Sequence, residues 1–190
     1  MRTTVLTAAL AAFVTVGLPA SSSNAMGPEK FTAFAIDASN MAPRARTSSV
    51  DLAINRWSTE AERDRLLSVF RDKGQDALLA ELQKLPTVGY IATPGSLRYD
   101  LHFAWQRPEA EGGRMIVLMT DRYIGAWEAA NRPRTIDYPF TLIQLQVDKG
   151  GAGEGKASVY TKITEAKDGT IELENFSSQP VMLNQVRKVR

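Results

Sequence analysis

Apolar and polar residues alternate along most of the chain after residue 26, and this alternation restricts the fold more than any other feature. Successive side chains of a strand point to opposite faces, so an alternating run predicts a strand with one apolar face. The predicted strands lie at 31–36, 49–57, 88–93, 97–105, 114–120, 140–148, 156–163, 170–175 and 181–189. Among these, residues 114–120 are apolar enough to be a central strand. A Lys-Asp-Gly turn before residue 170 and other short connections favour antiparallel pairing.

Between residues 59 and 85 the apolar period changes to that of a helix. Thr59 followed by Glu62 is typical of a capping box, Gly74 of a helix C-terminus, and Pro86 of a helix stop. We therefore expect an α+β fold: a mostly antiparallel, curved sheet of about eight or nine strands, as a sandwich or open barrel, with one helical hairpin packed on it.

The first 25 residues predict a secretory signal peptide. Arg2 supplies the positive start, residues 5–18 are apolar, and Ser23-Asn24-Ala25 is a small-x-small cleavage site. The apolar run is shorter than the roughly 20 residues that cross a bilayer, and polar residues follow it. We expect residues 1–25 to be removed, leaving residues 26–190 as a single α+β domain, exported to the bacterial periplasm or secreted. An uncleaved anchor is the alternative; the mature chain should have no membrane span.

Composition excludes several kinds of chemistry. The chain has no cysteine, which rules out thiolate nucleophiles, disulfides and cysteine-ligated metals. His102 is the only histidine, so a multi-histidine metal site is ruled out too. We expect no cofactor and no metal. A net charge of +2 is too small to indicate a nucleic-acid-binding surface.

The segment GGAGEGKAS, which begins at Gly150, matches the G-x-x-x-x-G-K spacing of a phosphate-binding loop. That loop needs a helix after it and a Ser or Thr after the lysine, whereas here Ala157 follows and the next residues alternate like a strand. We therefore expect a hairpin turn in which Gly150, Gly151, Gly153 and Gly155 allow the positive φ values of a long loop.

Two places could carry chemistry or binding. His102 shares a predicted strand face with Asp100, which suits either acid–base catalysis or a histidine on the wetter face of a sheet. Residues 121–135 are expected to be a long loop rich in aromatic and charged residues, which suits an anionic or ring-bearing ligand, or else a core plug with internal ion pairs. The candidate binding residues are Arg56, Trp57, His102, Asp121, Arg122, Trp127, Glu128, Arg132 and Arg134.

Four segments carry a family resemblance: RWSTEAERDRLL, KGQDALLAELQKLPTVGYI, MTDRYIGAWEAANRPRTIDYPFTLIQL and GEGKASVYTKI. In this order they resemble a family of small exported bacterial proteins of unknown function, over nearly all of the chain after the signal peptide. The resemblance implies export and a single domain. It implies no catalytic residue, and it suggests that GEGK belongs to a turn.

The sequence favours a noncatalytic exported module that binds a small ligand or a protein partner in the bacterial envelope or medium. No nucleophile motif accompanies the histidine, and the curved sheet carries one loop suited to binding. The alternatives are a hydrolase or isomerase that uses His102 with Asp100 or Asp121, and a structural protein of the envelope.

Overall fold

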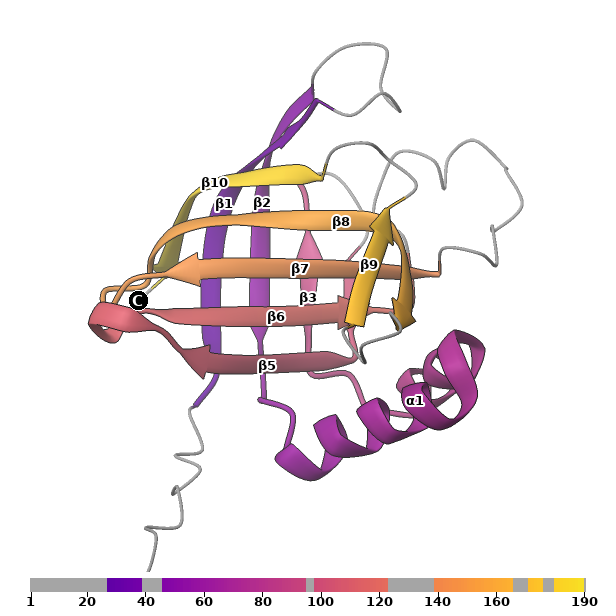
Figure 1. The fold of residues 1–190 in the computed structure, drawn as a ribbon. Coiled ribbons are helices and arrows are strands. Elements are labelled where there is room, and N and C mark those ends of the chain that lie inside the picture. Colours follow the sequence, from indigo (N-terminus) through magenta and orange to yellow (C-terminus); the bar gives the residue numbers. More distant parts are fainter. Residues whose placement is uncertain are drawn as a thin grey trace, which may run out of the picture.

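The computed structural model describes residues 27–38, 46–94, 98–122, 139–165, 171–175 and 180–189. Within these ranges ten strands form one antiparallel sheet that curves into a nearly closed barrel, with one α-helical element outside it (Figure 1). A short 3-10 helix, η1 (Ala110–Gly112), connects β5 and β6. The strands are β1 (Glu29–Asp37), β2 (Arg46–Ile54), β3 (Gly89–Ala92), β4 (Tyr99–Leu101), β5 (Phe103–Pro108), β6 (Arg114–Thr120), β7 (Phe140–Val147), β8 (Ala152–Glu165), β9 (Ile171–Asn175) and β10 (Val181–Val189). This confirms the predicted α+β class with a β-rich, curved sheet.

The strand order explains how the sheet closes. It runs β4-β3-β2-β1-β10-β8-β7-β6-β5, and β9 pairs with the C-terminal part of β8. The two end strands, β4 and β5, are consecutive in the chain and meet at His102, whose backbone N–H donates to the carbonyl of Met119 on β6 at 3.0 Å. The chain therefore passes from one edge of the sheet to the other within a single residue.

Alternation sends one side chain in two into the barrel, as the sequence predicts. On β6, for example, Ile116 and Leu118 are fully buried inside, while Val117 and Met119 face outward. The interior is filled by apolar side chains of the surrounding strands, as small barrels are. At one end the buried carboxylate of Glu29 accepts hydrogen bonds from Arg114 at 2.6 Å and Lys188 at 3.1 Å.

The helix α1 (Glu60–Leu82) covers the outer face of β5, β6, β7 and β8 rather than the interior. Leu66, Phe70, Leu78 and Leu82 are its buried apolar side chains, and they form a second core outside the barrel. The strand residues of this second core are Phe103, Phe140 and Ile163, with Trp105 and Met119 packed against it.

Gly74 interrupts the helix, as its sequence position predicts. It has φ 77° and ψ −168°, values that glycine adopts without the steric cost of a side chain. The element is therefore two helical segments that share one kink, and Figure 1 shows α1 bent along the outside of the barrel. The expected helical hairpin takes this kinked form.

The predicted strand at 97–105 is two strands in the structure. Tyr99 and Leu101 of β4 face the interior, but Phe103 and Trp105 of β5 face outward beneath α1. The bend at His102 shifts the alternation by one residue, so the apolar residues before and after it belong to different cores. A continuous alternating pattern cannot reveal such a shift, because the sequence period is the same on both sides.

The glycine-rich segment is a turn followed by a strand, as predicted, and not by the helix that a phosphate-binding loop requires. The expectation of a long loop with positive φ at all four glycines is wrong, since only Gly151 of the four has positive φ, at 83°. Gly153 and Gly155 lie inside β8, where a Cβ atom would overlap the backbone carbonyl oxygens of Gln146 and Gln144 on β7. Close strand approach, rather than turn geometry, explains these two glycines.

Candidate functional site

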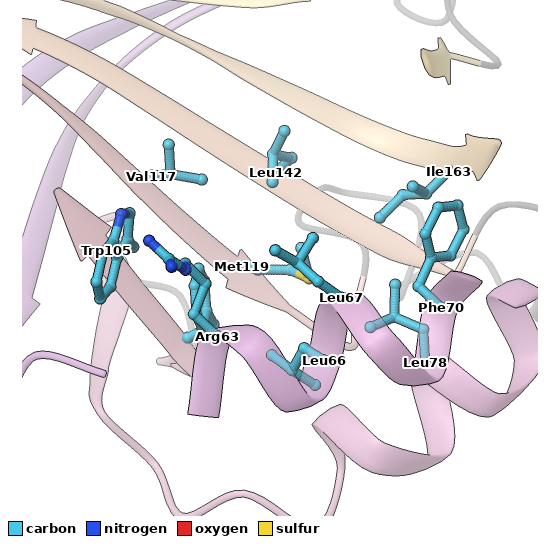
Figure 2. A pocket seen from close by; sticks show the side chains of 11 residues that line it. Arg63, Leu66, Leu67, Phe70, Leu78, Trp105, Val117, Met119, Leu142 and Ile163 are labelled. Carbon is cyan, nitrogen blue, oxygen red and sulfur yellow. The ribbon is translucent and has the colours of Figure 1, made fainter. Parts of the chain in front are cut away.

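A cavity of about 300 Å³ lies between α1 and the outer face of the barrel (Figure 2). Strand alternation directs the barrel side chains into it, and the first helical segment supplies most of the other wall. The lining residues are Arg63, Leu66, Leu67, Phe70 and Leu78 of α1, Phe103 and Trp105 of β5, Val117 and Met119 of β6, Leu142 of β7 and Ile163 of β8. Apart from Arg63, all have apolar or aromatic side chains.

Arg63 lies at one end of this cavity. Its guanidinium is 4.6 Å from the centre of the Trp105 ring, within the range of a cation–π contact. The same guanidinium donates to Oδ1 of Asp64 at 2.7 Å from Nη2 and 3.0 Å from Nε. The side chains of Arg63 and Asp64 are 37% and 63% exposed, so the cation is reachable from solvent as well as from the cavity.

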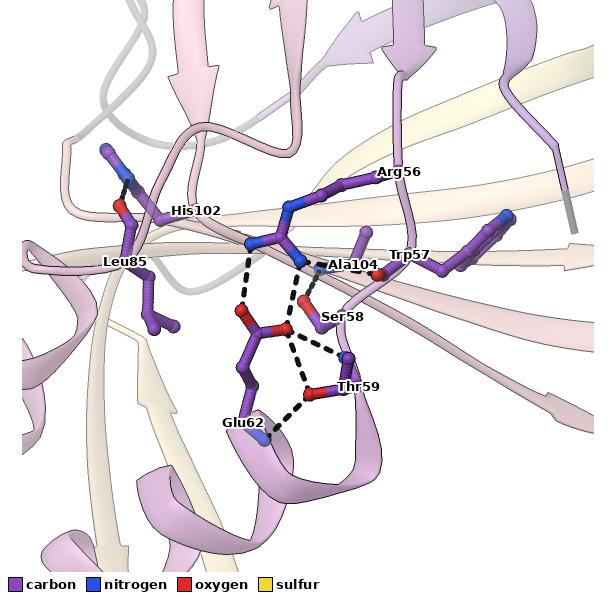
Figure 3. A network of polar contacts seen from close by, with 8 residues as sticks. All are labelled: Arg56, Trp57, Ser58, Thr59, Glu62, Leu85, His102 and Ala104. Atoms are coloured by element: carbon purple, nitrogen blue, oxygen red, sulfur yellow. Dashed lines mark hydrogen bonds and ion pairs between the residues drawn. The ribbon is translucent and has the colours of Figure 1, made fainter. Parts of the chain in front are cut away.

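A polar network fixes the N-terminus of α1 (Figure 3). Glu62 N–H donates to Thr59 Oγ1 at 3.1 Å, and Thr59 N–H donates to Glu62 Oε2 at 2.8 Å, which confirms the predicted capping box. Arg56 adds a bidentate pair to the same carboxylate, at 2.9 and 3.0 Å. The Arg56 guanidinium is the main reason that the pKa of Glu62 lies below its ordinary value.

The residue before the cap joins this network to the barrel. Ser58 is buried, its N–H donates to the carbonyl of Ala104 at 2.8 Å, and its Oγ accepts from the Ala104 N–H at 3.1 Å. The beginning of α1 is therefore attached to β5 at the position beside Trp105.

His102 attaches the chain just beyond the C-terminal end of α1. Its Nδ1 is 3.0 Å from the carbonyl oxygen of Leu85 (Figure 3), and since a carbonyl only accepts, Nδ1 carries the hydrogen. The Nε2 atom lies 3.6 Å from Oδ1 of Asp121, and both side chains are 16% exposed. Gln83 donates to the other oxygen of Asp121 at 3.1 Å. The hydrogen bonds of Leu85 and Gln83 therefore join the segment after α1 to the junction of β4 and β5 and to the residue that follows β6.

The structure brings together some of the predicted site residues. His102 and Asp121 are neighbours, which matches one of the two pairs proposed for acid–base chemistry. Asp100 is exposed on β4 and stands opposite Tyr90 of β3. Arg122 is exposed, next to Asp121 in the chain.

The remaining predicted residues have other surroundings. Arg56 binds Glu62 in the helix cap, and Trp57 packs against the interior core, with its ring 5.9 Å from the Arg114 guanidinium. None of the predicted residues that the structure describes lines the cavity. The predictions for Trp127, Glu128, Arg132 and Arg134 lie outside the described residues.

Sequence reasoning missed the cavity because its wall consists of residues that resemble ordinary core. Leu66, Phe70 and Leu78 belong to the helical segments that the sequence predicts to pack on the sheet, and they do pack there. One available signal was Leu67, which widens the apolar face of the first helical segment beyond a single stripe and lines the cavity.

Comparisons with known proteins found no matching family model, curated protein or solved structure. The resemblance to a family of exported proteins thus stays a prediction. Among the residues that the structure describes, no helix is long and apolar enough to cross a membrane. The same residues contain no group of three or more acidic or histidine side chains arranged to hold a metal ion.

Proposed function

We propose that the protein is a noncatalytic exported module that binds a small apolar ligand in the cavity between α1 and the strands β5, β6, β7 and β8. The cavity is the observation that carries the proposal. Its volume of about 300 Å³ is at the lower end of the range for ligand pockets, and its lining is apolar with one charged group. Export rests on the signal-peptide pattern of residues 1–25.

The surroundings of the cavity favour a binding site over a packing defect. Protein interiors are close-packed, and empty space beside core residues lowers stability. Here the residues just before and just after α1 are attached to the barrel by polar contacts, Ser58 to Ala104 and Leu85 to His102. The first helical segment of α1 therefore keeps its position on the barrel while the cavity that Leu67 lines stays open.

The role of His102 in holding the chain beyond α1 supports a noncatalytic protein. Its Nδ1 is engaged by a backbone carbonyl and its Nε2 faces Asp121. The alternative, a hydrolase or isomerase that uses this pair, would require a substrate to reach two largely buried side chains. A structural protein of the envelope is the third hypothesis, and it predicts a large partner instead of a small ligand.

Titration of residues 26–190 with the neutral fluorophore N-phenyl-1-naphthylamine tests the proposal. We expect a saturable rise in fluorescence, because the probe enters an apolar cavity. Val117→Phe should abolish this rise by filling the cavity from β6. Met115→Phe is the matched control, since Met115 is two residues away on the same outer face but outside the cavity.

Two outcomes would contradict the proposal: no saturable binding to the wild-type protein, or equal binding to the two phenylalanine variants. Native mass spectrometry of the exported, gently purified chain complements the titration. A small added mass that is lost on denaturation supports the proposal, whereas a stable complex with a large protein supports the structural alternative.

A further inference from the structure

We propose that the ligand of this cavity is a single-chain amphipathic anion, whose negatively charged head is bound by Arg63 and whose apolar tail extends along α1. This inference rests on the proposed function, because it assigns the ligand class of the same site. It starts from the position of the one charged side chain among the lining residues that the structure describes.

Arg63 is suited to bind an anion at this place. Its guanidinium is oriented by the Trp105 ring and has planar donors that match a carboxylate. Its present partner, Asp64, is an exposed sequence neighbour, and exposed ion pairs of this kind contribute little to stability. A ligand carboxylate can therefore replace Asp64 on the guanidinium at small cost.

The other cations near the start of α1 already have buried or bidentate partners. Arg56 binds both carboxylate oxygens of Glu62, and Arg65 pairs with the buried Glu81. Arg63 thus differs from its neighbours in having only an exposed carboxylate as its ion-pair partner while also lining an apolar cavity.

The far end of the cavity suits a tail. Phe70, Leu78 and Ile163 line that end, and Figure 2 shows them on the side away from Arg63 and Trp105. Along the helix, Arg63 and Phe70 are seven residue steps apart, which corresponds to about 10 Å. This length suits one medium-length acyl chain, with its head at Arg63 and its end near Phe70.

The test compares sodium decanoate with 1-decanol as displacers of N-phenyl-1-naphthylamine, because the two have the same chain and differ in the head. We expect the wild-type protein to prefer decanoate by roughly tenfold, the effect of one charge-assisted hydrogen bond. Arg63→Gln should remove this preference. Asp64→Asn should increase it, since the competing carboxylate is gone. Lys73→Gln removes a positive charge from an exposed position of α1 outside the cavity and should leave the preference unchanged.

Failure of this inference is distinguishable from failure of the proposed function. Equal displacement by decanoate and decanol would overturn the anionic head while leaving the apolar site intact. No binding of the fluorophore or of either displacer would overturn both. A similar loss of preference in Lys73→Gln would show a general charge effect and contradict the role of Arg63. Retention on phosphatidylglycerol vesicles that decanoate does not compete would also overturn the proposal, because it would indicate a lipid surface as the partner.

Discussion

Replacement of Glu62 by glutamine tests how α1 is held on the barrel. The carboxylate accepts two hydrogen bonds from Arg56 and one from the N–H of Thr59. Glutamine keeps one oxygen acceptor for the Thr59 N–H but loses the charge and the second acceptor. Glu62→Gln therefore removes the ion pair while leaving part of the cap, and Glu62→Ala removes both.

The expected magnitude follows from these contacts. Hydrogen bonds to charged groups contribute about 1.5–3 kcal/mol and neutral ones about 1 kcal/mol, and solvent-exposed pairs contribute less than 1 kcal/mol. The Glu62 side chain is 21% exposed and that of Arg56 is 35% exposed, so screening by water reduces the charged contribution. We expect Glu62→Gln to lower the free energy of unfolding by about 1–2 kcal/mol at pH 7, and Glu62→Ala to lower it by about 1 kcal/mol more, the usual effect of a lost cap.

The pH dependence distinguishes the ion pair from other causes. Because the folded state lowers the pKa of Glu62 below its ordinary value of 4.5, the ionised side chain stabilises the fold at pH values above 4.5. That stabilisation is lost as the pH falls below 4.5 and through the folded-state pKa. Urea unfolding of the wild-type protein and of Glu62→Gln is followed by circular dichroism between pH 7 and pH 3. The difference between their free energies of unfolding should be constant near neutrality and shrink in the acid range.

Glu60→Gln is the control, since Glu60 is an exposed acidic residue of the same first turn without an arginine partner among the described contacts. It should change stability by only a few tenths of a kcal/mol. A difference between wild type and Glu62→Gln that persists undiminished at pH 3 would refute the ion-pair explanation. Equal effects of the two glutamine substitutions would refute it as well.

Two further predictions concern the barrel and the histidine. Gly153→Ala should lower the free energy of unfolding by about 2–3 kcal/mol because the new methyl overlaps the backbone of Gln146, whereas Gly150→Ala meets only a side chain and should have a small effect in the same urea assay. His102→Asn keeps a donor near the Leu85 carbonyl and loses the contact with Asp121, so it should lower stability by about 1 kcal/mol and retain fluorophore binding. Loss of a catalytic activity of the wild-type protein in this variant, at unchanged stability, would support the hydrolase or isomerase hypothesis.

The sequence predicted those parts of the fold that depend on local patterns. Thr59 and Glu62 identify the start of α1 because a capping box involves only residues three apart. Gly74 identifies the kink for the same reason, since the backbone conformation is local. The mostly apolar run at 114–120 identifies β6 as a strand, but it does not show which of Ile116 and Val117 faces the interior.

Features that depend on strand order could not be predicted in this way. Val117 faces a cavity only because α1 covers β5 to β8, and the sequence does not say which outer face the helix covers. The glycines of β8 show the same limit. The glycine-rich composition around Gly153 suggests a turn, but the position requires glycine because the backbone of β7 approaches it too closely for a Cβ atom. His102 becomes a bend because the sheet closes there, which is a property of the whole barrel.

The filled barrel interior has a consequence for where a ligand can bind. Strand alternation gives this protein two apolar surfaces on β5, β6 and β7, one inward and one outward, and the inward one is occupied by its own side chains. On the outer face, α1 is the element that an apolar ligand would have to share space with. Because Glu62 and His102 hold α1 from outside the cavity, the helix can keep its place whether or not the cavity is filled. A bound ligand should then stabilise the folded protein by mass action.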